Sequence, residues 1–211
     1  MTKTDIGRSR GRPRAFDRDA ALAQATRLFW LKGYEATSIS DLTEVMGIGS
    51  PSLYAAFGSK DALYAEALAY YVEHYESLVW GKFHSAKTAR AAVEACLMDS
   101  AAVFTGSLMD VPPGCMVTLS SVDSEGHSEL GALVKGHRAV TLEYLKARFS
   151  RAVDEGEISP ATDIHALARF VQTVQNGMSI LARDGVTREE LQSVAQETMA
   201  SWDIRTANRA S

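Results

Sequence analysis

The stretch of residues 38–60 constrains the fold of this chain most, because it reads as two short helices joined by a tight turn. Ser38 and Asp41 form a capping pair at the start of the first helix. Gly47 ends that helix, since glycine tolerates the left-handed conformation of a C-terminal cap. Ser50 is expected to cap the second helix, with the following proline at its first position. This pattern predicts a helix-turn-helix unit.

The front of the second helix carries small side chains, which would let its backbone approach a DNA groove closely. Ser50, Ser52, Ala55 and Ala56 make up this front. Serine hydroxyls bond to phosphates or base edges, and the N–H groups at a helix start favour phosphate. Lys60 follows the helix and is placed to meet a backbone phosphate. Taken alone, the same pattern also describes a helical hairpin in a core, with no DNA role.

Charge is unevenly distributed along the 211 residues, which together carry a net charge of −4. Residues 1–60 contain 9 Lys or Arg and 6 Asp or Glu, a net +3, whereas residues 61–211 contain 13 and 20, a net −7. A basic head on an acidic body predicts that only the head meets a polyanion. Arg12 and Arg14 belong to a basic arm over residues 1–15, which would follow phosphates or enter the minor groove. The alternative for this arm is a solvated tail.

Composition and motifs argue against several classes of protein. The two cysteines form no CxxC pair, which suits a reducing compartment and offers no metal site. No apolar run approaches the roughly 20 residues that span a bilayer, and no secretory signal is recognisable, so we expect a cytoplasmic protein without a membrane partner. No G-x-S-x-G, phosphate-binding glycine loop or H-E-x-x-H motif is present, so we expect neither an enzyme nor a cofactor.

Helical periodicity predicts an all-α fold of about nine helices in two domains. The first, over residues 16–60, starts with a helix capped by Asp17 and holds three helices. The second covers residues 61–203, and a frayed tail is expected at 204–211. A long helix from about Ser59 to Phe83, broken near Gly81, would join the two.

The N-terminal motifs resemble those of the TetR family of transcriptional regulators. They include F-x-x-K-G-Y at residues 29–34, T-S at 37–38 and I-x-x-L-T at 39–43. The longest is G-x-x-x-x-x-L-Y-x-x-F-x-S-K-x-x-L at residues 47–63. The resemblance covers residues 14–64, and one departure is Met46, where the family often has alanine.

The resemblance implies a homodimeric repressor that binds a double-stranded, near-palindromic DNA operator and leaves it when a small-molecule effector enters the C-terminal domain. Tyr54 would reach a phosphate through its hydroxyl while its ring packs, and the alternative is a purely structural aromatic residue. The DNA contacts that the resemblance implies are Thr37, Ser38, Ser40, Ser50, Pro51, Ser52, Tyr54, Ala55 and Lys60.

An effector pocket is expected among the apolar, Met-containing and aromatic side chains of residues 71–182, which suits an uncharged or weakly charged organic molecule. Tyr71, Tyr75 and Trp80 are candidates to border it, although ordinary packing between helices explains them equally well. The expected lining comprises Tyr71, Tyr75, Leu78, Phe104, Met109, Cys115, Leu119, Val122, Phe170, Val174 and Met178.

Two amphipathic helices at the C-terminus can pair with their twofold mates as a four-helix bundle. The resemblance implies this use, and the alternative is packing within one chain. The expected interface comprises Val171, Gln175, Met178, Ala182, Leu191, Val194, Ala195, Thr198, Met199 and Trp202.

Two further hypotheses stay open. Cys115 stands at an expected helix N-terminus, a position that favours a thiolate, so the protein would sense electrophiles or oxidants; the alternative is a buried structural cysteine. A DNA-binding protein without an effector would instead have a tightly packed body. A metal site is not expected, because His127 and His137 are ten residues apart, which does not place them on one helical face.

Overall fold

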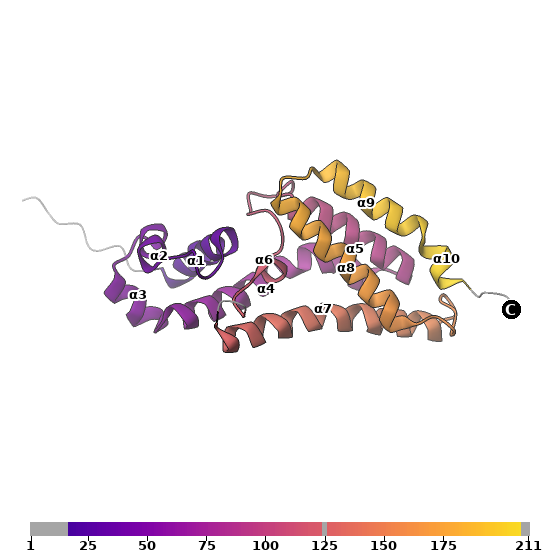
Figure 1. Cartoon of the computed structure of the whole chain (residues 1–211), viewed down its shortest axis with the longest axis horizontal. Helices are drawn as coiled ribbons and strands as arrows, with labels where there is room; N and C mark the ends of the chain where they lie inside the picture. Colours follow the sequence, from indigo (N-terminus) through magenta and orange to yellow (C-terminus); the bar gives the residue numbers. More distant parts are fainter. Residues whose placement is uncertain (1–16, 124–125, 208–211) are drawn as a thin grey trace, which may run out of the picture.

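The computed structural model describes residues 17–123 and 126–207, and this part of the chain is built from α-helices (Figure 1). At one end lies a head of three short helices, α1 (Arg18–Lys32), α2 (Ile39–Met46) and α3 (Ser50–Phe57). The long α4 (Lys60–Ser85) runs from the head into the body. The remaining elements are α5 (Ala89–Phe104), α6 (Met116–Leu119), α7 (Ser128–Asp154), α8 (Ile164–Arg183), α9 (Arg188–Ala200) and α10 (Trp202–Thr206). The all-α prediction is confirmed.

Local capping explains where most of these helices begin. A side-chain oxygen accepts a backbone N–H three residues later at each of these starts, which satisfies one of the free donors of the first turn. The capping residues are Asp17, Ser38, Ser59, Thr88, Asp163 and Thr187.

Two expectations about helix ends were wrong. Gly81 does not break α4, because a glycine inside a helix costs only about 1 kcal/mol and both neighbouring turns are held by buried Trp80 and Phe83. The tail expected to fray from residue 204 is instead helical as far as Thr206, where α10 ends. Trp202 and Thr206 are buried, and the Trp202 ring lies 5.7 Å from that of Phe149.

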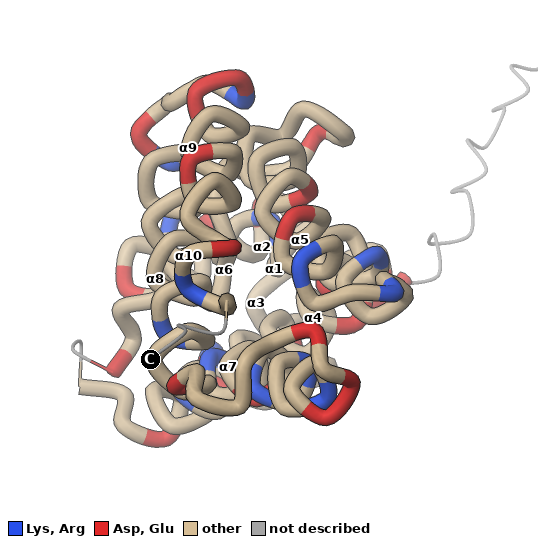
Figure 2. Tube along the Cα trace, turned by 90° about the vertical axis from the view of Figure 1, so that its right-hand side faces the viewer, with Lys and Arg blue, Asp and Glu red and all other residues tan. Residues whose placement is uncertain are grey.

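Side chains form two apolar clusters, one under the head and one in the body. In the body, α5 is central, since it packs against α4, α7, α8 and α9 (Figure 2). The head cluster includes the first half of α4, from Leu63 to Tyr71, and also reaches α6 and the start of α7. Val79, Trp80 and Phe83 of the second half of α4 belong to the body cluster. The domain boundary expected at 60/61 therefore falls at the start of a helix that both parts share.

Candidate nucleic-acid interface and effector pocket

The two helices of the turn unit are fixed by local hydrogen bonds. Ser38 Oγ accepts the N–H of Asp41, and Asp41 Oδ2 accepts the N–H of Ser38, each at 3.0 Å. These bonds, together with nearby Lys32, hold the pKa of the Asp41 carboxyl below its usual value. Gly47 ends α2 with a φ of 66°, the left-handed conformation that a side chain would disfavour. The capping pair and the glycine stop are confirmed.

The start of α3 differs by one residue from the expected one. Gly49 is the N-cap, Ser50 is the first helical residue and Pro51 the second. Ser50 therefore does not cap the helix, and its hydroxyl stays on the surface. Leu53 and Phe57 are buried and anchor α3 to the rest of the head.

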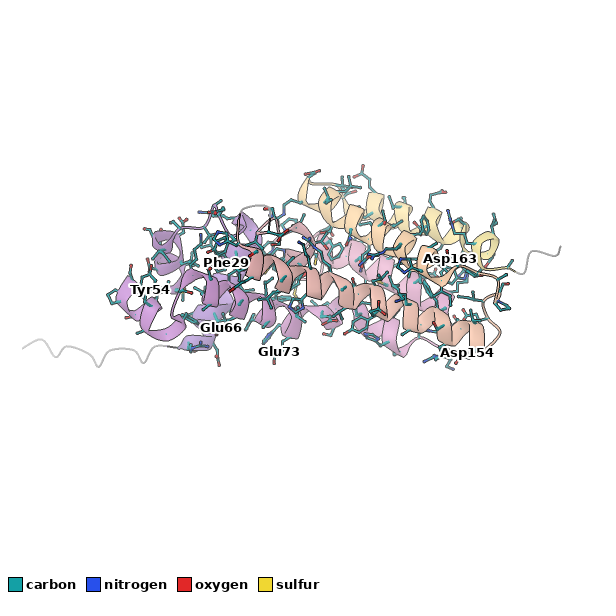
Figure 3. The ribbon with its side chains drawn as sticks, turned by 60° about the horizontal axis from the view of Figure 1, so that its bottom comes forward. Phe29, Tyr54, Glu66, Glu73, Asp154 and Asp163 are labelled. Atoms are coloured by element: carbon teal, nitrogen blue, oxygen red, sulfur yellow. The ribbon has the colours of Figure 1, made fainter. Side chains whose placement is uncertain are left out.

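The outer face of α3 is exposed and made of small side chains, apart from one tyrosine. The Tyr54 side chain is 47% exposed, and it projects at the outer end of the head in Figure 3. About half of the residue is therefore open to solvent, and Tyr54 is not a buried core aromatic. The other expected contacts on this side of α2 and α3 that are exposed are Ser38, Ser40, Ser50, Pro51, Ser52 and Ala55.

Two of the expected DNA contacts make interactions within the head. Thr37 is fully buried, and its hydroxyl donates to the carbonyl of Gly33 at 2.6 Å, so its side chain does not face a ligand. The Lys60 ammonium lies 4.1 Å from the centre of the Tyr34 ring, a cation–π contact that holds it against the head. Arg12 and Arg14 lie outside the described residues.

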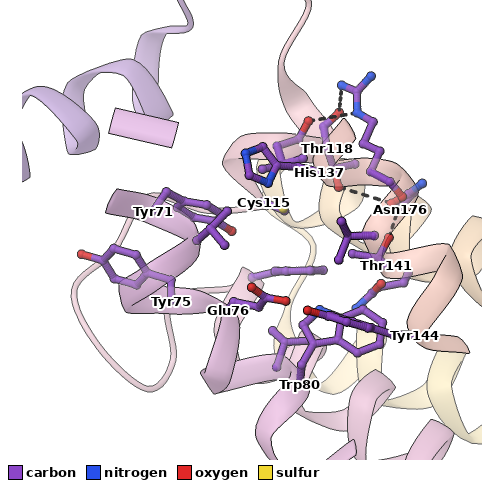
Figure 4. A pocket seen from close by; sticks show the side chains of 17 residues that line it. Tyr71, Tyr75, Glu76, Trp80, Cys115, Thr118, His137, Thr141, Tyr144 and Asn176 are labelled. Carbon is purple, nitrogen blue, oxygen red and sulfur yellow. Dashed lines mark hydrogen bonds between the residues drawn. The ribbon is translucent and has the colours of Figure 1, made fainter. Parts of the chain in front are cut away.

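A cavity of about 210 Å³ opens in the body between α4, α6, α7 and α8 (Figure 4). Of the expected lining, Tyr71, Tyr75, Phe104 and Cys115 border it. Val122 and Met178 are buried in the apolar clusters instead, and Met109 is exposed. The other expected residues that do not line this cavity are Leu78, Leu119, Phe170 and Val174.

The part of the cavity lining that was not expected from the sequence consists mostly of polar residues. Gln175, assigned to a dimer interface by its helical spacing, also faces the cavity. The available signal for this wall was the group of polar residues that α7 carries. Residues missed in this way include Glu76, Thr118, His137, Arg138, Thr141, Tyr144 and Asn176.

Rings and hydroxyls dominate the chemistry of the cavity. The Trp80 and Tyr144 rings meet edge to face at 5.6 Å, and those of Tyr71 and Tyr75 stack at 5.6 Å. Burial raises the pKa of the Tyr71 phenol well above its usual value, and the neighbouring Cys115 adds to this effect. For Tyr144, burial and then the charge of Glu76 and a hydrogen bond to it raise the pKa of the phenol.

The segment before and through α6 is tied to α7 and α8 by polar contacts. Arg138 donates from Nε to the Val117 carbonyl at 3.0 Å, and from one terminal nitrogen to the carbonyls of Thr118 and Ser120 at 3.0 and 2.7 Å. Gly114 approaches α8 so closely that a Cβ would lie 2.8 Å from the Ser179 carbonyl oxygen. Glycine is thus required where this wall of the cavity meets α8.

The cavity touches the head through Trp30 of α1. The Trp30 ring lies 4.8 Å from that of Tyr71 and 5.3 Å from that of Tyr75, both of which line the cavity. The indole N–H donates to the Gly114 carbonyl at 3.0 Å, one residue before Cys115. A residue of the head therefore packs directly behind two rings of the cavity wall.

The expected dimer interface is largely occupied inside the protomer. Nine of its ten side chains are buried in the single chain, and only Val194 is exposed, at 37%. The apolar stripe of α8 and α9 packs on α5, so a partner would have to use the outer faces of these helices. The nine buried side chains are Val171, Gln175, Met178, Ala182, Leu191, Ala195, Thr198, Met199 and Trp202.

Cys115 precedes α6, which is only four residues long and so presents a short dipole. Its backbone N–H donates to Ser179 Oγ at 2.8 Å, and the residue is half-buried at the cavity wall. Over residues 17–123 and 126–207, no group of three or more His, Cys, Asp or Glu is placed to hold a metal ion. No helix of the same part is long and apolar enough to cross a membrane.

A family model, curated proteins and solved structures are similar to this chain. Residues 21–67 match the family model described as bacterial regulatory proteins, tetR family. The HTH-type transcriptional repressor ComR of Escherichia coli K12 is 35% identical over 93% of this chain and 94% of its own length. The repressor BdcR of the same organism is 29% identical over 93% of each chain. A cysteine mutant of the regulator CifR, solved with a 26-base-pair operator, is 38% identical with a TM-score of 0.83, covering 91% of this chain and 100% of its own.

Proposed function

Because this chain belongs to the TetR family of DNA-binding transcriptional regulators, we propose that it is a homodimeric repressor whose operator affinity falls when a small organic molecule enters the cavity of the body. The observation that supports the DNA-reading part is the exposed, small-residue face of α3, held on a buried Leu53 and Phe57. Its exposed serines and backbone N–H groups suit phosphates and base edges. The related CifR was solved on operator DNA.

Dimerisation is proposed through the outer faces of α8 and α9. Three apolar side chains are exposed there: Ile180 at 51%, Leu181 at 40% and Val194 at 37%. Small or polar neighbours, such as Thr173 and Ser193, would allow two helix pairs to approach closely around a twofold axis. Such a dimer would hold two copies of α3 for two half-sites of a near-palindromic operator.

The effector response is proposed to run from the cavity to α1. A molecule between α4 and α7 would press on Tyr71 and Tyr75, whose rings contact Trp30. Trp30 lies in the same apolar cluster as the buried side chains of α3. Its displacement would therefore change the spacing of the two copies of α3 in the dimer. The shift can only be as large as the difference in effector affinity between the two states.

A gel shift on the DNA upstream of this protein's own gene, titrated with salt, tests the DNA-reading part. We expect a specific complex that weakens as salt rises, because phosphate contacts release counterions. Tyr54→Ala should weaken binding to all DNA by about tenfold or more, whereas Tyr70→Ala, on α4 away from α3, should leave it unchanged. Equal affinities of the two variants, with the dimer intact, would contradict the assignment of α3.

One of the two other hypotheses is a DNA-binding protein without an effector, which would have a tightly packed body. The cavity is an argument against it. Sensing through Cys115 keeps one supporting observation, its place on the cavity wall. Cys115→Ser tests it, because an unchanged response of operator binding to electrophiles would remove thiol chemistry from the mechanism.

A further inference from the structure

One acidic side chain faces the aromatic cavity, and no basic residue of segments 17–123 and 126–207 forms an ion pair with it. Glu76 lies half-buried on α4, among the rings of the cavity wall. We propose that the cavity selects a small organic cation, with Glu76 as its counter-ion. Such a molecule would have one ring and an ammonium or amidinium group. This inference rests on the proposed function, because it names the chemical class of the effector, and it replaces the uncharged or weakly charged molecule expected from the apolar composition.

Aromatic rings flank the carboxylate on two sides. In Figure 4, Glu76 lies between Tyr75 on one side and Trp80 and Tyr144 on the other. The Trp80 and Tyr144 rings meet at 64° and 5.6 Å, so they present differently oriented faces and edges to the same space. Ring faces attract cations, most strongly indole, and this attraction grows where water is excluded. Rings beside a carboxylate therefore favour a positive group over a neutral one.

The charge of Glu76 is not cancelled by a neighbouring base. No Lys or Arg of the described segments lies within ion-pair distance of it, although the chain makes such pairs elsewhere. Its evident polar partner is the Tyr144 phenol, a donor that stabilises the carboxylate but leaves its negative charge in place. An ionised carboxylate that is half removed from water gains most from a ligand that brings the opposite charge.

Of the two basic residues at the cavity, Arg138 is bound mainly to the cavity wall itself. It directs Nε and one terminal nitrogen at the carbonyls of Val117, Thr118 and Ser120, so these donors are committed to the backbone around α6. His137 stands on the α7 wall, opposite Glu76 on α4. The acidic body, with a net charge of −7 over residues 61–211, further raises the local concentration of cations.

Size limits the ligand to about one ring. A cavity of about 150 Å³ takes up benzene, so the 210 Å³ measured between α4 and α7 holds one ring with a short charged chain. The 2-phenylethylammonium ion has these dimensions. Its alcohol analogue, 2-phenylethanol, keeps the ring and chain without the charge, and phenylacetate reverses the charge.

Calorimetric titration of the dimer with these three molecules, without DNA and at pH 8, tests the inference. We expect the ammonium ion to bind at least about tenfold more tightly than the alcohol, and phenylacetate to bind most weakly. In Glu76→Gln the preference for the ammonium ion should fall to about twofold, while binding of the alcohol is kept, which also shows that the cavity is intact. The matched control is Glu73→Gln, an exposed carboxylate one turn earlier on α4, which should behave as the natural protein.

Three results would overturn the inference. These are equal binding of the ammonium ion and the alcohol, preference for phenylacetate, and no binding of any of the three at millimolar concentration. A gel shift with the same molecules separates this inference from the regulatory proposal. Cation binding without release of the operator would leave the cation site standing and contradict the effector response. Release of the operator by a neutral or acidic molecule alone would support the effector response and contradict the cation site.

Discussion

Two of the polar contacts between the head and the body differ in chemistry. In the Arg183 contact, the guanidinium of Arg183 on α8 donates to the carbonyls of Trp30, Leu31 and Pro113 at 2.7 to 3.0 Å. In the His127 contact, His127 lies 3.2 Å from a carboxylate oxygen of Glu35. The first uses neutral acceptors beside the buried Trp30, whereas the second uses a carboxylate on the surface.

This difference separates two roles. The Arg183 contact adjoins Gly114 and the rings behind the cavity, so a change in the cavity reaches it through packed atoms. Partial burial lowers the pKa of Arg183 below its usual value, yet the guanidinium stays charged at any physiological pH. The His127 contact is more open to solvent and salt, since the Glu35 side chain is 55% exposed. We therefore expect the first contact to transmit the effector signal and the second only to adjust the resting position of the head.

Removing the Arg183 contact should have the largest effect. Arg183→Met leaves three carbonyls without their charged donor, and we expect the free energy of unfolding to fall by about 2 kcal/mol. Operator binding should persist, while the effector concentration needed for release rises about tenfold. Urea unfolding and gel shifts with effector measure the two quantities.

Arg27→Met is the matched control for that variant. Arg27 also joins the head to the body, but its ion pair with Asp110 is exposed, so we expect a loss of at most about 1 kcal/mol and a normal response. Equal effects of the two arginine variants would show that the head–body contacts are interchangeable, and the comparison would fail.

A smaller effect is expected at Trp30, where a single hydrogen bond can be removed. Trp30→Phe keeps a ring against Tyr71 and Tyr75 but deletes the indole N–H that donates to Gly114. Leaving that carbonyl unpaired should cost about 1 kcal/mol and blunt the effector response. Trp202→Phe, at a similarly buried indole far from the head, controls for lost volume. A normal effector response in Trp30→Phe would place the signal path elsewhere.

The His127 contact should matter less and depend on salt. His127→Ala is expected to change the free energy of unfolding by less than about 1 kcal/mol, since the Glu35 side chain is 55% exposed. The difference from the natural protein should shrink further when unfolding is repeated at high salt, because exposed charges are screened. His165→Ala, at an exposed histidine on α8, provides the control. A large loss of unfolding free energy that is insensitive to salt would mean that the His127 and Arg183 contacts stabilise the protein to a similar extent.

The head was predictable from sequence because its determinants are local. The capping pair of Ser38 and Asp41 spans three residues, and Gly47 stops α2 through its own φ angle. Errors there were single-residue shifts, as at the N-cap of α3. Thr37 was misassigned as a DNA contact, since only the packed structure shows that its hydroxyl turns inward to Gly33.

The cavity was only half predictable, because periodicity identifies buried faces but not what covers them. The stripe on α8 and α9 was recognised as apolar, yet its partner is α5 of the same chain and not a second copy. Conversely, nothing in the sequence singled out Glu76 or His137 as pocket residues, and tertiary packing brings them to one cavity. Polar residues that line a cavity look like solvent-facing residues until the opposite wall is known.

The smallest effect is expected when one of the two capping boxes is removed, the one in the head or the one in the body. Hydrogen bonds from Ser38 lower the pKa of Asp41, and those from Thr187 lower the pKa of Glu190. A carboxyl whose pKa is lower in the folded state stabilises the fold above its unfolded pKa, near 4, and this contribution is lost as pH falls through the folded value. Ser38→Ala and Thr187→Ala should therefore reduce the melting temperature slightly at pH 7 and less at pH 3. If the Arg183 contact couples head and body, both variants will shift one common thermal transition. A separate early transition in Ser38→Ala alone would show that the head melts independently, and the signal would then have to travel through α4 without the Arg183 contact.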